Sequence, residues 1–503
     1  MKKKLKNNLV AYKNSKVILL ILFMILILGF YLRIGGALSG SFAFTYDVGR
    51  DMLQMQDIAV NHKIPLIGQT SGLGGLFYGP WWYYILTPAY IISAGNPQGV
   101  ALFMVLVGVA AIVTGFFLGK RIGSLYLGIL IAGFLSFSAV MISSSVQIWN
   151  PNTAPFFVLL FFLCFFVETG KKYKSILLNL FCGILLGLIL DSEIVFGVLF
   201  IAGLGAASIT VLRKEIFSKR LIFLIAGFVF TLLPRLFFEL RHGFVMTKSL
   251  TNISDEQSIL NIKDFFHVLP ERLAVFLSLF SETFGINVLI STVICILIVP
   301  LWLWLGKKAP QNIRKLFFTC LIILLIFLTG SSFFARAIWG HYLVAVPVLY
   351  ILILSIFLYS ITKRYKILGI ILSIIFLVAT VRPLDVVSNI QNSNWEGDAA
   401  VYRNQVAVID YIYKNADGKK FNYTAYTPSV HDYPYRYLFS WYGMNKYGYT
   451  PDTDAQKELY VILEPDPGYE GRLTNWLKIR EGDGKIINEN TIKGGIKVQK
   501  RVR

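Results

Sequence analysis

Charged side chains are scarce in this sequence. Asp, Glu, Lys and Arg make up 15% of its 503 residues, whereas soluble domains carry roughly 25%. Hydrophobic residues account for 55%, and the mean hydropathy is +0.62. This composition excludes an ordinary soluble enzyme and a disordered chain, and it predicts a protein that crosses the membrane several times.

Acidic residues and cysteines are also few. There are 28 Asp and Glu against 48 Lys and Arg, which gives a formal charge of +20. The basic residues are dispersed between apolar runs and do not gather on one face, so no nucleic-acid partner is expected. The four cysteines (Cys164, Cys182, Cys295 and Cys320) all fall inside apolar runs. They support neither a disulfide framework nor a thiolate metal site.

Eleven segments are apolar enough to be expected to cross a bilayer as helices, because lipid offers backbone groups no hydrogen-bond partner. They are residues 17–36, 98–118, 124–142, 153–167, 175–190, 194–212, 221–238, 286–305, 315–330, 341–360 and 366–383. The expected fold class is therefore a polytopic α-helical membrane protein over residues 1–383.

The basic residues also predict the orientation. With the N-terminus in the cytoplasm, 22 Lys and Arg fall in the inside segments, and such a bias sets topology. The chain is thus expected in the plasma membrane with its C-terminal region outside the cell. Of the 14 carboxylates before residue 391, 12 fall on the outer side. They indicate either chemistry at the outer surface or simply the places that lysines avoid.

Two long segments are expected on the outer side of the membrane, residues 37–97 and residues 239–285. Residues 37–97 form a long first outer loop in which we expect two interfacial helices. The first, over residues 44–62, has an apolar stripe of Val48, Met52, Met55 and Ala59 that would lie flat on the membrane. The second is the aromatic run from Tyr78 to Tyr90, which is too short to cross.

Residues 384–503 are polar and contain no span, which predicts a separate extracytoplasmic domain. Its pattern alternates helix and strand and so favours a small α/β domain. Helices are expected over 402–415 and 471–480, and strands over 421–426, 459–463, 485–489 and 496–500.

The first outer loop contains a pair of acids at helical spacing. Asp47 and Asp51 are four residues apart and share one helix face, with Arg50 beside them. Such acids could take a proton from an acceptor hydroxyl or amine. The alternatives are that Asp47 only caps a helix and that Asp51 only pairs with Arg50.

A cationic cluster follows the seventh expected span. Arg235, Arg241 and His242 lie where that helix leaves the membrane, and guanidinium groups suit the phosphate of a lipid-linked donor. The alternative is an internal ion pair between Arg235 and its i+4 neighbour Glu239, with the other side chains at the interface.

Smaller polar groups lie at other outer ends of the spans. Arg336 and His341 precede the tenth span and could contact phosphate, although His341 also fits an interfacial belt. Trp149 and Asn150 could stack on and bond to a sugar, or only form a turn. We expect Asp191 and Glu193, in a tight turn, to be solvated.

Metal binding has weak support. Asp47, Asp51 and Glu239 could surround a hard cation, but they lie in distant loops and have no ligand spacing. No cofactor is predicted, and a divalent cation is left open.

Four short motifs resemble a known family. Asp47 matches the acid of its Asp-Glu pair, although Val48 replaces the Glu. Residues 78–84 of this chain, which include Trp81, correspond to a His-Pro-Pro-Leu-Tyr-Tyr-Tyr stretch of the family. Pro80, Tyr83 and Tyr84 match that stretch, whereas Tyr78 stands in place of the His. The run from Pro234 to Phe244 is similar to a segment of many such chains, and His341, Tyr342 and Pro347 resemble an Arg-Tyr, four residues, Pro pattern.

With these motifs, the chain resembles the bacterial members of glycosyltransferase family 39, the protein-mannosyltransferase and aminoarabinose-transferase group of the GT-C fold. The resemblance covers about residues 15–385. It implies transfer of a sugar from a polyprenyl-phosphate donor to a lipid, glycan or protein acceptor, with inversion and with Asp47 as base. Arg235, Arg241, His242, Arg336 and His341 are the candidates for the donor phosphate. Substrate-lining candidates are Arg50, Tyr78, Trp81, Glu239, Trp149 and Asn150.

Two other classes of function stay open. A transporter or flippase of a lipid-linked glycan would use a similar set of helices, but it usually has internal repeats and charged or broken helices near the bilayer middle. A non-catalytic assembly or receptor protein would need fewer spans. The sequence identifies neither the sugar nor the acceptor.

Overall fold

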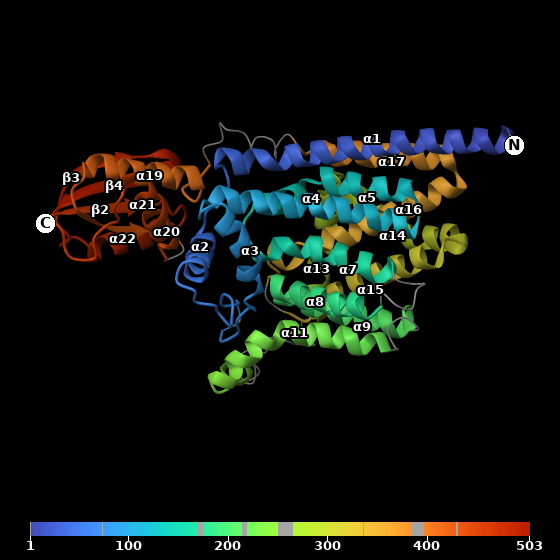
Figure 1. Ribbon diagram of the computed structural model, residues 1–503, viewed down its shortest axis with the longest axis horizontal. Helices are drawn as coiled ribbons and strands as arrows, with labels where there is room; N and C mark the ends of the chain where they lie inside the picture. Colours follow the sequence, from blue (N-terminus) through green and yellow to red (C-terminus); the bar gives the residue numbers. More distant parts are fainter. Residues whose placement is uncertain are drawn as a thin grey trace.

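The computed structural model describes residues 2–503 apart from 73, 168–174, 214–218, 250–264, 335–336, 385–396 and 429–430. A long helical bundle carries a small α/β domain at one end, which we call the domain end (Figure 1). The N-terminus lies at the far end of the bundle. The predicted fold class is confirmed at a coarse level: the chain is mostly helical and has a small mixed sheet near its C-terminus.

Helices occupy all eleven predicted spans. The bundle consists of α1 (Lys2–Ser39), α4 (Pro97–Ile122), α5 (Leu125–Phe137), α6 (Ala139–Val146), α7 (Ala154–Val167), α8 (Ser175–Ser192), α9 (Ile194–Thr210), α11 (Lys219–Arg241), α14 (Val288–Leu305), α15 (Gln311–Ser332), α16 (Val346–Arg364) and α17 (Lys366–Val381). Within the described residues, six helices are long and apolar enough to cross a membrane, or seven if the bent pair α5 and α6 is one span. Four shorter apolar helices complete the set.

Arg33 explains the bend of 62° between α5 and α6. Its guanidinium is fully buried and donates to the carbonyls of Leu135 (2.8 Å) and Ser136 (3.0 Å), where α5 ends, and to the hydroxyl of Ser145 (3.2 Å) in α6. A helix end leaves carbonyl groups without partners. Arg33 therefore supplies the donors that the break requires.

Helix α13 (Phe265–Phe284) lies across the domain end of the bundle. Its Arg272 donates to the Phe334 carbonyl just after α15, and its Phe276 and Phe284 carbonyls accept hydrogen bonds from Tyr350 and Thr380. Those partners lie near the domain ends of α15, α16 and α17. Residues 239–285, predicted to be an outer segment, thus contribute a helix that covers this end.

The first outer loop forms two helices, α2 (Tyr46–Ala59) and α3 (Trp81–Ile92). The prediction that the first would lie flat on the membrane is wrong. Its stripe of Val48, Met52 and Met55 is buried in a cluster that includes Tyr435 and Tyr437 of the C-terminal domain. The apolar face is therefore covered by protein and not by lipid.

The C-terminal domain contains a four-stranded sheet. Its elements are α19 (Tyr402–Ala416), β1 (Phe421–Tyr426), α20 (Tyr433–Leu438), η4 (Phe439–Gly443), α21 (Met444–Tyr447), β2 (Glu458–Leu463), α22 (Glu470–Ile479), β3 (Lys485–Thr491) and β4 (Lys497–Val502). The strand order is β1-β2-β4-β3, with β1 parallel to β2 and the other pairs antiparallel. The predicted helices and strands are all present, whereas α20, η4 and α21 were not predicted.

Hydrogen bonds and a ring stack fix this domain to the first outer loop. Phe44 donates to the Ala400 carbonyl at 2.6 Å, Tyr402 donates to the Phe42 carbonyl at 3.1 Å, and the Phe42 and Tyr402 rings stack 5.1 Å apart. The Trp441 indole donates to the Ala94 carbonyl at 2.8 Å. The domain therefore holds the first outer loop near both of its ends.

Candidate active site

A pocket of about 410 Å³ opens between the bundle and the first outer loop. Five groups of described residues line it: the start of α2, residues 69–72 with 78, the turn at 149–151, residues 193–195 where α9 begins, and residues 334, 337, 339, 341 and 342. Its side chains are mostly polar or aromatic. We refer to it as the loop pocket.

Asp47 lies in the first turn of α2 and faces the loop pocket. The helix begins at Tyr46, and its N-cap is Thr45, so Asp47 does not act as the cap. Its Oδ1 is 2.7 Å from Arg50 Nη1, and its side chain stays 24% exposed. The acid is therefore oriented by an arginine and is still open to the pocket.

Asp51 does not reach the loop pocket. Its side chain is fully buried and accepts hydrogen bonds from Arg50 (Nε 3.0 Å, Nη2 2.8 Å) and from the Trp82 indole (2.7 Å). Burial alone would lower the pKa of Arg50, but the carboxylates of Asp51 and Asp47 outweigh this effect and raise it. Asp51 is thus a partner of Arg50, as the alternative interpretation of the sequence proposed, and the geometry does not support a catalytic role for it.

Glu193 is a second carboxyl group in the loop pocket. It is 1% exposed, accepts the Tyr78 hydroxyl at 3.0 and 3.1 Å, and lies 4.0 Å from His341 Nε2. Burial raises the pKa of Glu193 to about 7. Burial and the neighbouring Glu193 also raise the pKa of Tyr78 above its usual value. The prediction that Glu193 is a solvated turn residue is wrong, because the surrounding loops enclose the turn.

Arg235 pairs with a residue from another helix. Its Nη2 is 2.5 Å from Asp191 Oδ1, and Asp191 is 2% exposed. The other oxygen of Asp191 lies against the backbone of Gly79, where a Cβ atom would come within 1.7 Å of it. This pair fixes the Tyr78–Gly79 segment but does not line the loop pocket. The alternative interpretation, an i+4 pair with Glu239, is not found in the structure, and Asp191 is not solvated.

The rest of the predicted cationic cluster points elsewhere. Glu239 accepts the backbone N–H groups of Met246 (2.8 Å) and Thr247 (2.9 Å), so it caps the turn that follows α11. Arg241 and His242 are exposed, and His242 stacks on Phe238 at 4.2 Å. None of these three residues lines the loop pocket, within the part of the chain that the structure describes.

The remaining predicted residues divide into two groups. Tyr78, Trp149, Asn150 and His341 line the loop pocket together with Asp47 and Arg50. The Trp149 and His341 rings lie 5.0 Å apart, and Asn150 also donates to the Ser192 carbonyl at 2.6 Å. Trp81 instead donates to the Thr231 carbonyl of α11 and does not line the pocket. Arg336 lies outside the described residues.

The three carboxylates that could surround a hard cation have other partners in the structure. Asp47 and Asp51 are both bonded to Arg50, and Glu239 binds backbone amides. Among the described residues, no three His, Cys, Asp or Glu side chains lie together as metal ligands.

A larger, mainly apolar pocket of about 1260 Å³ adjoins the loop pocket. Both are lined by Trp149, Trp339 and His341. The larger pocket lies between α6, α13 and the segment before α16, at the domain end of the bundle. The arrangement can hold an apolar chain beside a polar group, which is the chemistry of a lipid-linked head group.

Sequence reasoning missed Glu193, Asp191 and Arg33. The turn at Asp191–Glu193 has the polar composition of a solvated turn, so its burial could not be predicted from its residues. An arginine inside an apolar run is a stronger signal, because a buried guanidinium needs several acceptors. Arg33 carried that signal within the first predicted span.

Comparison of the structure with solved structures shows a similar fold in ArnT from Cupriavidus metallidurans. The apo state aligns over 97% of this chain and 98% of that chain, with a TM-score of 0.59 and 11% identity. ArnT bound to undecaprenyl phosphate aligns over the same shares, with a TM-score of 0.57 and 11% identity. The Archaeoglobus fulgidus oligosaccharyltransferase in its apo form aligns over 79% of this chain and 58% of that chain, at 14% identity and a TM-score of 0.46.

No protein-family model matches the sequence, and no curated protein matches it. The similarity to ArnT is therefore one of fold. It confirms the GT-C fold that the sequence resemblance implied.

Proposed function

We propose that this chain is a membrane glycosyltransferase that moves a sugar from a polyprenyl-phosphate donor to an acceptor at the outer face of the plasma membrane. The observation that carries the proposal is the position of Asp47, which faces a polar pocket of about 410 Å³ beside an apolar pocket of about 1260 Å³. The ArnT-like fold supports it, since one ArnT structure contains undecaprenyl phosphate.

Asp47 is the proposed general base. It takes a proton from the acceptor hydroxyl or amine while the acceptor atom attacks the anomeric carbon of the donor. The bond between that carbon and the phosphate oxygen breaks on the opposite face, and its electron pair stays on the phosphate. The anomeric configuration is inverted. Because a phosphate is a good leaving group, the reaction needs no strong general acid.

The described basic residues of the loop pocket are Arg50 and His341. Asp47 and Asp51 already balance the charge of Arg50, and burial lowers the pKa of His341, so both residues would act on the leaving phosphate as hydrogen-bond donors and not as net positive charges. Arg336 is a third candidate, since it stands in the sequence between Phe334 and Ala337, which both line this pocket. Preorganised donors stabilise the charge that develops on the phosphate. Arg235 is a weaker candidate than the sequence indicated, because Asp191 already balances its charge.

The charges at the two ends of helix α4 support the proposed orientation. It begins at Pro97, close to Gly95, whose carbonyl accepts a hydrogen bond from Tyr437 of the C-terminal domain, and it ends with Lys120 and Arg121. Basic residues mark the cytoplasmic end of a span. The loop pocket and the C-terminal domain are then extracytoplasmic.

A transfer assay tests the proposal. The purified protein in lipid nanodiscs is mixed with a panel of polyprenyl-phosphate sugars and candidate lipid, glycan and peptide acceptors, and products are identified by mass spectrometry. We expect transfer by the wild type and at least about 100-fold slower transfer by Asp47→Asn. If no donor gives transfer, while proteoliposomes translocate a lipid-linked glycan, the chain is a transporter and the proposal is wrong.

A further inference from the structure

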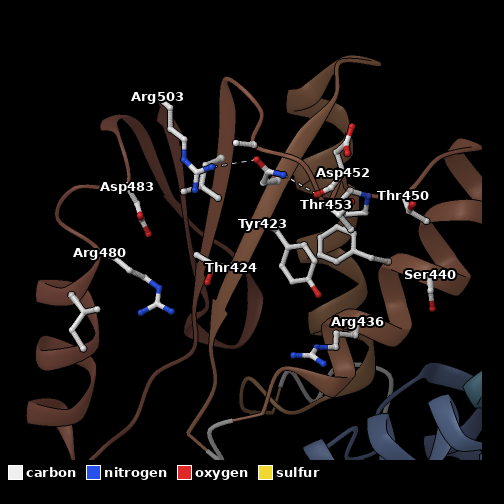
Figure 2. Close-up of a pocket in the computed structure, with 16 residues that line it drawn as sticks. Tyr423, Thr424, Arg436, Ser440, Thr450, Asp452, Thr453, Arg480, Asp483 and Arg503 are labelled. Atoms are coloured by element: carbon white, nitrogen blue, oxygen red, sulfur yellow. Dashed lines mark hydrogen bonds between the residues drawn. The ribbon is translucent and has the colours of Figure 1, made fainter.

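The C-terminal domain has a polar pocket of its own. It encloses about 840 Å³ beside β1, which is an edge strand of the sheet. Figure 2 shows Arg480 and Arg436 reaching into it from opposite sides, with Thr424 and Tyr423 between them. None of the described residues that line it also lines the loop pocket around Asp47. We call it the domain pocket.

One wall of the domain pocket is held by a buried arginine. Arg501 donates to the Arg480 carbonyl at 2.7 Å and is itself bonded to Gln499 Oε1 at 2.6 and 3.0 Å. Arg501 and Gln499 are both buried. They fix the backbone of the turn after α22 from which Arg480 and Asp483 face the pocket, so this part of the wall needs little backbone ordering when a ligand binds.

The opposite wall is fixed by Asn422 of β1. Its amide donates to the carbonyls of Asp452 (2.8 Å) and Asp454 (2.7 Å), and its Oδ1 accepts the Gln456 N–H at 2.6 Å. These bonds hold the 450–456 loop against the start of the strand. Arg503 Nη1 donates to Asn422 Oδ1 at 3.4 Å. The pocket is therefore preformed on both sides.

The charges of the domain pocket are partly balanced within the chain. Arg436 pairs with Asp432 at 2.6 Å, and Asp452 pairs with Lys420 at 3.3 Å. Arg480 stacks on Trp476, with its guanidinium carbon 3.7 Å from the ring centroid. In this position its N–H groups point parallel to the ring, where they can donate to a ligand. Of the side chains that line this side of the pocket, those of Arg480 and Arg503 are cationic and that of Asp483 is anionic.

We propose that the domain pocket binds an anionic saccharide, meaning a sugar that carries a carboxylate or a phosphate. Guanidinium groups bind such anions with two parallel hydrogen bonds. The hydroxyl groups of Thr424, Ser440, Thr450 and Thr453 suit sugar hydroxyls, and the rings of Tyr423 and Phe439 offer apolar surface for a pyranose. A peptide adding to the sheet at β1 fits less well, because the 450–456 loop already covers the first residues of that strand.

Calorimetric titration of the full-length protein in detergent tests this site with three probes: hexagalacturonate, mannose 6-phosphate and maltohexaose. At least one anionic sugar is expected to bind saturably and more weakly as salt rises. Binding of the first shows recognition of a carboxylate, and binding of the second shows recognition of a phosphate. Maltohexaose, which is neutral, is expected to bind about tenfold more weakly or not at all.

Two variants connect the binding to the pocket. Arg480→Gln and Arg503→Gln should each weaken binding of the anionic sugar by about tenfold or more. Lys478→Gln is the matched control and should leave binding unchanged. It also removes one positive charge, but from an exposed position of α22, two residues before Arg480 and outside the pocket. The proposal fails if both anionic sugars do not bind, if maltohexaose binds equally well, or if both arginine variants bind like the wild type.

Discussion

Arg50 lies between two carboxylates of its own helix, with Nη1 2.7 Å from Asp47 and Nη2 2.8 Å from Asp51. The environments of the two acids differ. Asp51 is fully buried and also bonded to Trp82, whereas Asp47 faces the loop pocket. Substituting the two acids should therefore have separable effects, one on the rate of transfer and one on stability.

Asp47→Asn should abolish most of the transfer. An amide cannot take the acceptor proton, and loss of a general base costs about 10²- to 10⁴-fold in rate. The midpoint temperature of unfolding should stay close to that of the wild type, because the site is partly exposed. Asp57→Asn is the matched control, since Asp57 lies further along α2, is exposed to solvent and does not line the loop pocket. Normal transfer by Asp47→Asn would contradict the assignment of the base.

Asp51→Asn should instead destabilise the protein. The amide leaves the charge of the half-buried Arg50 with Asp47 as its only carboxylate partner on this helix, and breaking a buried pair costs about 3 kcal/mol or more. Thermal unfolding followed by tryptophan fluorescence should show a lower midpoint temperature than for Asp47→Asn. Equal midpoints for the two variants would show that Asp51 does not hold Arg50 in place.

Gly79→Ala tests the contact between the first outer loop and α8. The new methyl group would overlap Asp191, since even its ideal position is 1.7 Å from Oδ2. Either the Asp191–Arg235 pair or the Tyr78–Gly79 segment must shift, at a cost of about 1–3 kcal/mol. We expect both stability and transfer to fall. Gly74→Ala is the control, because no atom lies within 4 Å of a Cβ there.

The sequence predicted those features of the fold that depend on local pattern. Apolar runs predicted the bundle helices, and alternation predicted all four strands of the C-terminal domain within one or two residues of their bounds. The helix at α2 was also predicted, because Val48, Met52 and Met55 recur at helical spacing. What covers that stripe could not be predicted, since a lipid surface and a protein surface select the same apolar side chains.

The candidate site was only partly predictable for a related reason. Six residues that were predicted from their types and their places in outer loops all line one pocket: Asp47, Arg50, Tyr78, Trp149, Asn150 and His341. From the sequence, ion pairs can be proposed only between near neighbours, so Glu239 was the one alternative partner considered for Arg235. Its partner is Asp191, 44 residues away in the chain. Which helices lie side by side decides such a pair, and no local pattern contains that information.

Glu193 should make donor affinity depend on pH. Burial raises the pKa of this carboxyl to about 7, so it is mostly neutral below pH 7 and ionised above. The ionised form would repel the donor phosphate in the same pocket, by about 1 kcal/mol or more at several ångströms. The KM for the donor should therefore rise several-fold between pH 6 and pH 8. Glu193→Gln should remove this rise, and an unchanged profile in the variant would exclude Glu193 as its cause.

Glu464 in the C-terminal domain should make stability depend on pH without affecting the site. It is 5% exposed and accepts hydrogen bonds from Tyr435 (2.8 Å) and Gln405 (3.1 Å). Burial raises its pKa to about 7, above the ordinary value of 4.5. Because the folded state prefers the neutral form, its stabilising contribution is complete below about pH 4.5 and is lost as the pH rises to about 7.

Glu464→Gln keeps a neutral acceptor, so its midpoint temperature of unfolding should vary less over this range and exceed that of the wild type at pH 8. Glu481→Gln, an exposed control, should follow the wild type, and a variant less stable than the wild type at pH 8 would show that Glu464 is needed as a carboxylate.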